Sequence, residues 1–110
     1  MTSGEIVLVN FQGATGIKRR PAVVVSTDAY HLERPDVILA VITTRVDSAT
    51  AKTDYSLRDW QDAGLHKPSA FRAYFGTYER TNVSSVVGKL SDHDWKEVRV
   101  RLSISIAIGE

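Results

Sequence analysis

Short apolar stretches separated by polar segments run through the first ninety residues of the chain. They are rich in β-branched and aromatic side chains, which favour strands. The pattern predicts strands over 5–11, 22–26, 37–44, 69–80 and 83–90. Proline lacks the N–H that a sheet ladder needs, so we expect Pro21 to begin the second strand and the glycine-containing segment before it to be a loop.

Polar segments fill the gaps between these strands, and two parts of the chain favour helices. The residues around Pro35 predict a turn, and 45–54 predicts an exposed loop. Leu57 and Trp60, followed by a glycine, predict a short helix near 57–63. The middle of the chain is therefore mostly sheet.

The C-terminal segment carries two conflicting signals. Ser91 before "DHDW" is typical of a helix N-cap, with Asp94 at the third helical position and acidic residues that suit the helix dipole. From Val98 to Ile108, however, apolar and polar residues alternate, which is typical of a strand. The pattern alone leaves helix and strand both open.

Composition indicates an ordinary soluble protein of one domain, spanning 1–110. Apolar residues make up 43% of the chain and charged residues 25%, which argues against a disordered or fibrous protein. No apolar run approaches the roughly 18 residues that span a bilayer, and the N-terminus lacks signal-peptide features. We therefore expect a cytoplasmic protein with no membrane association. The absence of cysteine excludes disulfides and thiol chemistry.

Charge is balanced overall, with a net charge of +1, so any anion site must be local. The densest positive cluster is Lys18, Arg19 and Arg20, directly before Pro21 and an apolar strand. A guanidinium presents a planar fork of donors that fits a phosphate, and the proline fixes the backbone beside Arg20. The alternative is a solvated strand edge whose charges discourage pairing with other chains.

Two further groups could bind a nucleotide. Thr43 and Thr44 end an apolar strand, where their hydroxyls could donate to a phosphate oxygen or could simply suit a strand. Arg72 and Tyr74 are two residues apart and therefore on one strand face, where they could supply a cation and a stacking surface. An arginine that extends from an edge strand into solvent is the alternative.

Several kinds of site find no support. The three histidines, His31, His66 and His93, are far apart and lack partners at metal-ligand spacing, so we expect no metal site and no cofactor. A phosphate-binding P-loop, a dinucleotide glycine motif and a nucleophile elbow are also absent from the sequence.

Taken in order, the motifs resemble the MazF/PemK family of bacterial toxin ribonucleases from type II toxin–antitoxin systems. The resemblance rests on "GEIVLVNF", "KRRPAVVVS", "VILAVITT", "LHKPSAFRAYFGTY" and "VGKLSDHDWKEVRVRL", which span nearly the whole chain. It implies a mainly β fold, an SH3-like β-barrel of the PemK/CcdB type with a C-terminal α-helix, and it decides the C-terminal segment in favour of helix. It also implies a homodimer.

The resemblance further implies metal-independent cleavage of single-stranded RNA, in which the ribose 2'-OH attacks the adjacent phosphate and leaves 2',3'-cyclic phosphate and 5'-hydroxyl ends. Arg20 would stabilise the transition state or protonate the leaving oxygen, and Thr43 would bind the scissile phosphate. Lys18, Arg19, Thr44, Arg72 and Tyr74 would contact RNA. Tyr74 stands where part of the family has an acid, and tyrosine, with a pKa of about 10, is a poor base at neutral pH.

The implied partner is a cognate antitoxin that blocks the RNA groove with an acidic, flexible segment, in a complex that also binds DNA. Two alternatives use the same barrel without RNA cleavage. One is a toxin that poisons DNA gyrase, although such toxins use a C-terminal tail containing tryptophan and this chain ends "IAIGE". The other is a barrel that only binds a protein partner through Trp60 and the aromatic residues at 71–78.

Overall fold

The structure is a computed structural model that describes residues 1–107, without the side chains of 11–13. Six strands, two α-helices and two 3₁₀ turns follow one another along this part of the chain. They are β1 (Glu5–Gly13), β2 (Gly16–Val24), α1 (Asp28–Glu33), β3 (Asp36–Thr43), η1 (Val46–Ser48), β4 (Tyr55–Ser56), β5 (Ala70–Glu79), η2 (Arg80–Asn82), β6 (Val83–Lys89) and α2 (Asp92–Ser105).

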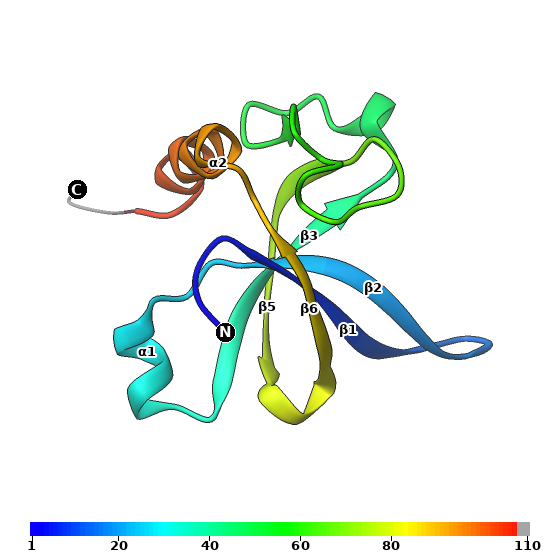
Figure 1. Cartoon of the computed structure of the whole chain (residues 1–110), viewed down its shortest axis with the longest axis vertical. Coiled ribbons are helices and arrows are strands. Elements are labelled where there is room, and N and C mark those ends of the chain that lie inside the picture. The colour runs from blue at the N-terminus through cyan, green and yellow to red at the C-terminus, as the bar shows by residue number, and fades with distance from the viewer. Residues whose placement is uncertain (108–110) are drawn as a thin grey trace.

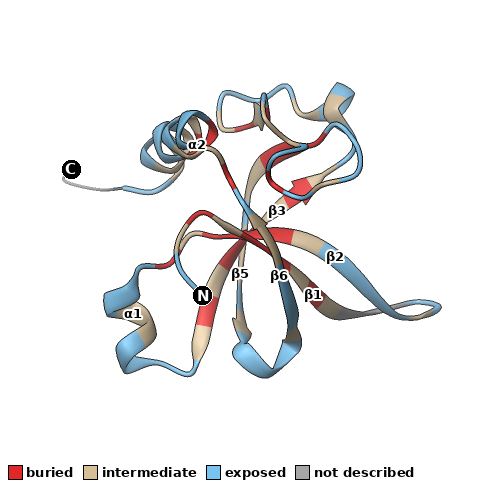
Figure 2. Cartoon of the chain, viewed as in Figure 1, coloured by how far each residue is buried: buried red, intermediate tan, exposed pale blue. Residues whose placement is uncertain are grey.

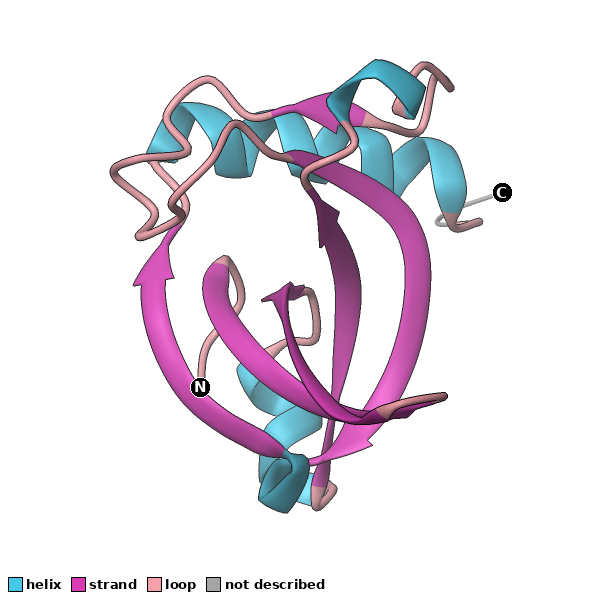
Figure 3. Cartoon of the chain, turned by 90° about the vertical axis from the view of Figure 1, so that its right-hand side faces the viewer, coloured by secondary structure: helices cyan, strands magenta, loops and turns pink. Residues whose placement is uncertain are grey.

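The six strands form one antiparallel sheet in the order β4-β5-β3-β2-β1-β6. The sheet twists and curls strongly, and α2 lies across one end of it (Figure 3). Because the outer strands β4 and β6 are not paired with each other in the described residues, the barrel-like sheet is open. The mainly β, barrel-like fold with a C-terminal helix is thus confirmed.

Two apolar clusters occupy opposite faces of the sheet. Neighbouring residues of one strand, such as Val23 and Val24, belong to different clusters, as the alternation of a strand requires. The first cluster lies beneath α2 and the loop that follows β4, and includes Phe71 and Val98, both fully buried. The second consists of Val7, Val9, Ala22, Val24, Val37 and Leu39. Buried segments concentrate where the strands cross (Figure 2).

Helix α2 resolves the conflict between the two C-terminal signals. Trp95, Val98 and Leu102, spaced three and four residues apart, pack against the first cluster, as one face of a helix does. Val100 and Ile104 are 44% and 55% exposed, so the alternating pattern divides into a buried and an exposed helix face. Ile108, the last alternating residue, lies outside the described residues.

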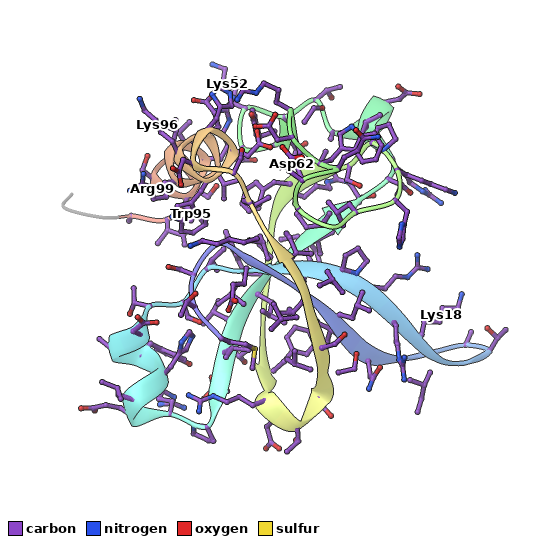
Figure 4. The ribbon with its side chains drawn as sticks, viewed as in Figure 1. Lys18, Lys52, Asp62, Trp95, Lys96 and Arg99 are labelled. Carbon is purple, nitrogen blue, oxygen red and sulfur yellow. The ribbon has the colours of Figure 1, made fainter. Side chains whose placement is uncertain are left out.

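Two contacts hold α2 in place, one at the start of the helix and one with the N-terminal segment of the chain. As expected, Ser91 is its N-cap, and the Ser91 Oγ accepts a hydrogen bond from the Asp94 N–H at 3.1 Å. Figure 4 shows Trp95 on the side of α2 that faces the sheet and Lys96 on the opposite side. Trp95 packs on Gly4, whose φ of 90° favours glycine and where a Cβ would lie 3.3 Å from the indole.

The predicted short helix at 57–63 is wrong, because the segment forms consecutive turns. The carboxylate of Asp94, fully buried at the start of α2, accepts hydrogen bonds from the Tyr55 hydroxyl and from the backbone N–H groups of Arg58 and Asp59, at 2.6, 3.1 and 2.8 Å. These contacts hold the backbone of 58–59 to α2. Burial, followed by the bond to Asp94, raises the pKa of Tyr55.

Two other segments also differ from expectation. Strand β2 begins at Gly16, so the predicted loop at 16–20 is one arm of a long β1–β2 hairpin, in which Gly13 pairs with Gly16. Helix α1 replaces most of the turn expected before Pro35, with Thr27 as its N-cap. The hairpin projects from the body of the sheet (Figure 1). Within the described residues, no helix is long and apolar enough to cross a membrane.

Candidate functional site

The site lies where strands β2 and β3 separate. The two strands pair antiparallel over three positions, which are Ala22 with Val41, Val23 with Ala40, and Val24 with Leu39. If this register continued by two residues, Arg20 would lie opposite Thr43. The ladder stops at Pro21, which has no N–H to donate. Pro21 therefore ends the β2–β3 pairing rather than beginning β2, and the two strands open at the positions of Arg20 and Thr43.

A pocket of about 410 Å³ occupies this opening. Its deeper wall is apolar and comes from the second cluster, through Val9, Ala22 and Leu39. The complete lining is Val9, Arg20, Pro21, Ala22, Leu39, Ala40, Val41, Ile42, Thr43, Thr44, Arg45, Tyr74, Phe75, Gly76 and Tyr78. The pocket thus combines an apolar wall from the sheet with polar groups from the ends of β2 and β3.

A bulge in β5 brings an aromatic residue to the same pocket. Ala40 pairs with Phe75 and Val41 with Arg72, so the two intervening residues of β5, Ala73 and Tyr74, have no partner on β3. Bulges bend a strand and redirect its side chains, and they are frequent next to active sites. Tyr74 lines the pocket and is 74% exposed, so its ring is accessible to a ligand.

The charged groups of the pocket are all cationic. Among the residues that the structure describes, its lining includes two arginines, Arg20 and Arg45, and neither a carboxylate nor a histidine. Arg20 and Arg45 are both exposed. Two guanidinium groups with hydroxyls from threonine and tyrosine form a set of donors that suits a phosphate group. The arrangement can therefore bind an anion and stabilise negative charge that develops on it.

The hydroxyl of Thr43 is oriented by the backbone. Its Oγ1 accepts a hydrogen bond from the Arg45 N–H at 3.1 Å. Within the described residues this hydroxyl has no hydrogen-bond acceptor for its own proton, so it can donate to a ligand oxygen. The same turn leads from β3 into η1, because the Ser48 N–H and Oγ both donate to the Arg45 carbonyl, at 3.2 and 3.0 Å.

Of the seven residues singled out in the sequence, the structure brings four together in the pocket: Arg20, Thr43, Thr44 and Tyr74. Lys18 and Arg19 are exposed on the hairpin and do not line it. Strand alternation puts Lys18 on the same face as Arg20, and Figure 4 shows it on the projecting arm. Arg19 belongs to the opposite face, across from Asn10.

Arg72 is also outside the pocket lining. Its Nε lies 3.8 Å from a carboxylate oxygen of Asp54, whose side chain is only 5% exposed. A buried carboxylate needs a countercharge, so Arg72 has a structural role at the edge of the site. Its predicted contact with RNA stays a prediction.

Two polar lining residues, Arg45 and Tyr78, were not among the predicted RNA-contacting residues. Arg45 follows Thr43 and Thr44 directly, and a cation beside two hydroxyls was a usable signal. Tyr78 lies two residues after Gly76 on β5 and packs against the second apolar cluster. Within residues 1–107, no three His, Asp or Glu side chains lie close enough to hold a metal ion.

Comparison with known families decides where the chain belongs. Residues 2–106 match the model of the PemK-like, MazF-like toxins of type II toxin–antitoxin systems. The chain belongs to this toxin family. No curated protein sequence matches the chain.

Solved structures agree with this PemK/MazF fold at low sequence identity. An endoribonuclease bound to its cognate antitoxin, from a mycobacterial species, is 16% identical and superposes with a TM-score of 0.81, covering 100% of this chain and 98% of its own. A MazE–MazF complex from Deinococcus radiodurans is 20% identical with a TM-score of 0.74 and covers 94% of each chain. MazF-mt6 from Mycobacterium tuberculosis is 18% identical with a TM-score of 0.72, covering 92% and 94%. At these identities the likeness shows the fold.

Proposed function

We propose that this toxin is an endoribonuclease that cleaves single-stranded RNA without a metal ion, using the pocket between β2 and β3. The observation that carries the proposal is that Arg20 and Thr43, from separate strands, meet in one pocket whose described lining residues supply cations and hydroxyls and no acid. Membership of a toxin family with structural neighbours named as endoribonucleases supports it.

In the proposed reaction, the ribose 2'-oxygen forms a bond to phosphorus and the bond from phosphorus to the 5'-oxygen breaks. The proton leaves the 2'-hydroxyl, and a proton is delivered to the departing 5'-oxygen. The products are a 2',3'-cyclic phosphate and a 5'-hydroxyl. Arg20 stabilises the extra charge on the phosphorane or protonates the leaving oxygen, and the Thr43 hydroxyl donates to a non-bridging oxygen.

Binding of the RNA chain would extend beyond the scissile phosphate. Thr44 and Arg45 lie beside Thr43 and would hold the phosphate, while the exposed ring of Tyr74 would stack on a base. Lys18 would attract the RNA backbone from the hairpin arm, and Arg19 and Arg72 would contribute charge at longer range.

No described residue of the pocket lining can serve as a general base. With no carboxylate or histidine among these residues, we assign the main catalytic contribution to electrostatic stabilisation by Arg20, and the 2'-hydroxyl proton to solvent. General acid–base groups contribute about 10²- to 10⁴-fold to typical reactions, so the turnover should be slow for a ribonuclease.

The cognate antitoxin would inhibit this toxin by occupying the same pocket. An acidic, flexible segment has the charge needed to pair with Arg20 and Arg45 and to exclude RNA. The active toxin is proposed to be a homodimer that acts in the cytoplasm, and its complex with the antitoxin is proposed to bind DNA.

The test is to incubate the purified protein with a long single-stranded RNA in EDTA and to map the chemical groups at the new ends. DNA of the same sequence is the matched control, because it lacks the 2'-hydroxyl. The proposal expects cyclic phosphate and 5'-hydroxyl ends from RNA and no cleavage of DNA. Intact RNA, or RNA and DNA cut alike, would contradict it and favour a toxin that acts by binding a protein.

A further inference from the structure

The pocket is larger than a phosphate site requires, and part of its lining has no role in the chemistry above. A volume of about 410 Å³ is in the range that holds a drug-sized molecule, whereas a phosphate has only five heavy atoms. The lining also includes four residues that the proposed phosphate contacts do not use: Val9, Leu39, Gly76 and Tyr78. An apolar wall beside an anion site suits a ligand that carries a flat apolar group next to its charge.

Tyr78 has its ring fixed at this wall. The ring packs against the second apolar cluster, and Tyr78 pairs with Val37 of β3 in the sheet register. Gly76 makes room for it, because a Cβ on Gly76 would lie 2.9 Å from the Tyr78 Cε1 and 3.3 Å from its Cζ and hydroxyl oxygen. Any larger residue at 76 would therefore displace the ring. The ring is held against the strand and also borders the pocket.

The hydroxyl of Tyr78 is available to a ligand. Within the described residues it has no hydrogen-bond partner, and the side chain is only half-buried. A fixed aromatic ring provides a stacking surface, and a hydroxyl at its end can donate to or accept from the edge of a base. Recognition of single-stranded RNA depends on such contacts with unstacked bases.

We propose that Gly76 and Tyr78 form a nucleobase-binding subsite, which holds a base next to the scissile phosphate while Arg20 and Thr43 hold the phosphate. The inference rests on the proposed ribonuclease function and adds a specificity-determining residue to it. Tyr78 contacts the substrate, whereas Gly76 is a positioning residue that acts through the ring. Tyr74, on the exposed bulge, would stack on a base outside the pocket.

The experiment compares the wild type with Tyr78→Leu, Tyr78→Phe and Gly76→Ala. Each protein cleaves one long mixed-sequence RNA transcript, and the cut sites are mapped. Removing a base-stacking ring should lower kcat/KM about 5- to 100-fold and relax the cleavage motif, while Tyr78→Phe keeps the ring and should stay within about threefold. Gly76→Ala should change the motif with a smaller loss. Tyr30→Leu is the matched control, because Tyr30 is also half-buried and does not line the pocket.

A second measurement identifies the base. Short RNAs containing the preferred site are made with one base at a time removed on either side of the cut. If Tyr78 holds one of these bases, removing that base should slow the wild type by a similar factor and should slow Tyr78→Leu no further. An equal penalty in both proteins would overturn the subsite.

The outcomes separate this inference from the proposed function. If the wild type cuts no RNA, both fall. If the wild type cuts and Arg20→Ala does not, but Tyr78→Leu retains the motif and rate, only the subsite falls. If the circular dichroism spectrum shows that Tyr78→Leu does not fold, the base-removal series on the wild type decides. A cleavage rate at least fivefold lower after removal of one base supports the subsite, and an unchanged rate at every position overturns it.

Discussion

Replacing Arg20 by alanine removes the group on which the proposed mechanism depends most. Arg20 is exposed, and it stands where Pro21 ends the pairing of β2 with β3. On its other edge, β2 stays paired with β1 at this point, where Arg20 lies opposite Val9 and Pro21 opposite Leu8. Substitution of an exposed residue usually changes the free energy of unfolding by no more than about 0.5 kcal/mol, so the fold should persist.

The expected loss of activity follows from the placement of the guanidinium. A preorganised donor that meets developing charge is worth about 10²- to 10³-fold in kcat, or about 2.7–4 kcal/mol. Arg20 borders a pocket open to solvent, which screens its charge, so the lower end of that range is the better expectation. We expect Arg20→Ala to lower kcat about a hundredfold and to change KM much less, because the contact strengthens in the transition state.

The assay measures initial rates on a short fluorescent RNA that contains the preferred cut site. The matched control is Arg19→Ala, which removes the same charge one residue away, on the opposite strand face. A general effect of net charge on RNA binding would lower kcat/KM equally in both variants and would show a similar dependence on salt. Equal activities of the two variants, or a change confined to KM in Arg20→Ala, would refute the assigned role.

Three further changes have defined expectations. Thr43→Val, which keeps the shape of the side chain, should lower kcat about tenfold in the same RNA assay by removing one hydroxyl donor; unchanged kcat would exclude a contact with the phosphate. Asp94→Ala leaves three donors without an acceptor and should cost about 3–5 kcal/mol in urea unfolding; a loss under about 1 kcal/mol would contradict that reasoning. The hydrogen bond from Tyr30 lowers the pKa of Asp36 in the folded protein. The ionised Asp36 therefore stabilises the fold above the ordinary aspartate pKa of about 3.9, and this stabilisation is lost as the pH falls through the lower pKa of the folded state. The urea midpoints of the wild type and Asp36→Asn should therefore differ at pH 6 and converge near pH 2; an equal difference at both would contradict the assignment.

Much of the sheet could be predicted because its signal is local. Apolar runs such as 37–42 carry buried residues on both faces, and they mark strands without knowledge of the partner strands. The C-terminal helix could not be predicted from the hydrophobic pattern alone. Its exposed face carries Val100 and Ile104, so that apolar and polar residues alternate along the segment as they do in a strand. The N-cap Ser91 was the better guide, since capping reports on the backbone itself.

Two segments differ from the prediction, one bound to a distant part of the chain and one with a local signal that was overlooked. The segment expected to be a helix at 57–63 forms turns instead, and its Arg58 and Asp59 N–H groups donate to Asp94, more than thirty residues later. No local pattern reports such a bond. Helix α1 was missed although Thr27 and Pro35 bound it, which is a signal that could have been used.

The candidate site was predicted in part for a related reason. Arg20 and Thr43 could be named from motifs, and their meeting follows from the β2–β3 register. The bulge at Ala73 and Tyr74, and the room that Gly76 leaves for Tyr78, depend on how β5 pairs with β3. Such features become visible only when the strands are placed side by side.

The measurement that tests the central claim most directly uses one RNA with a single 2'-deoxy nucleotide placed immediately 5' of the preferred cut. The unmodified RNA is the control, and a second cut site in the same strand serves as an internal reference. Attack by the 2'-hydroxyl predicts that cleavage at the modified linkage is abolished while the reference site is cut at its normal rate. Cleavage at the deoxy linkage would contradict the proposed mechanism.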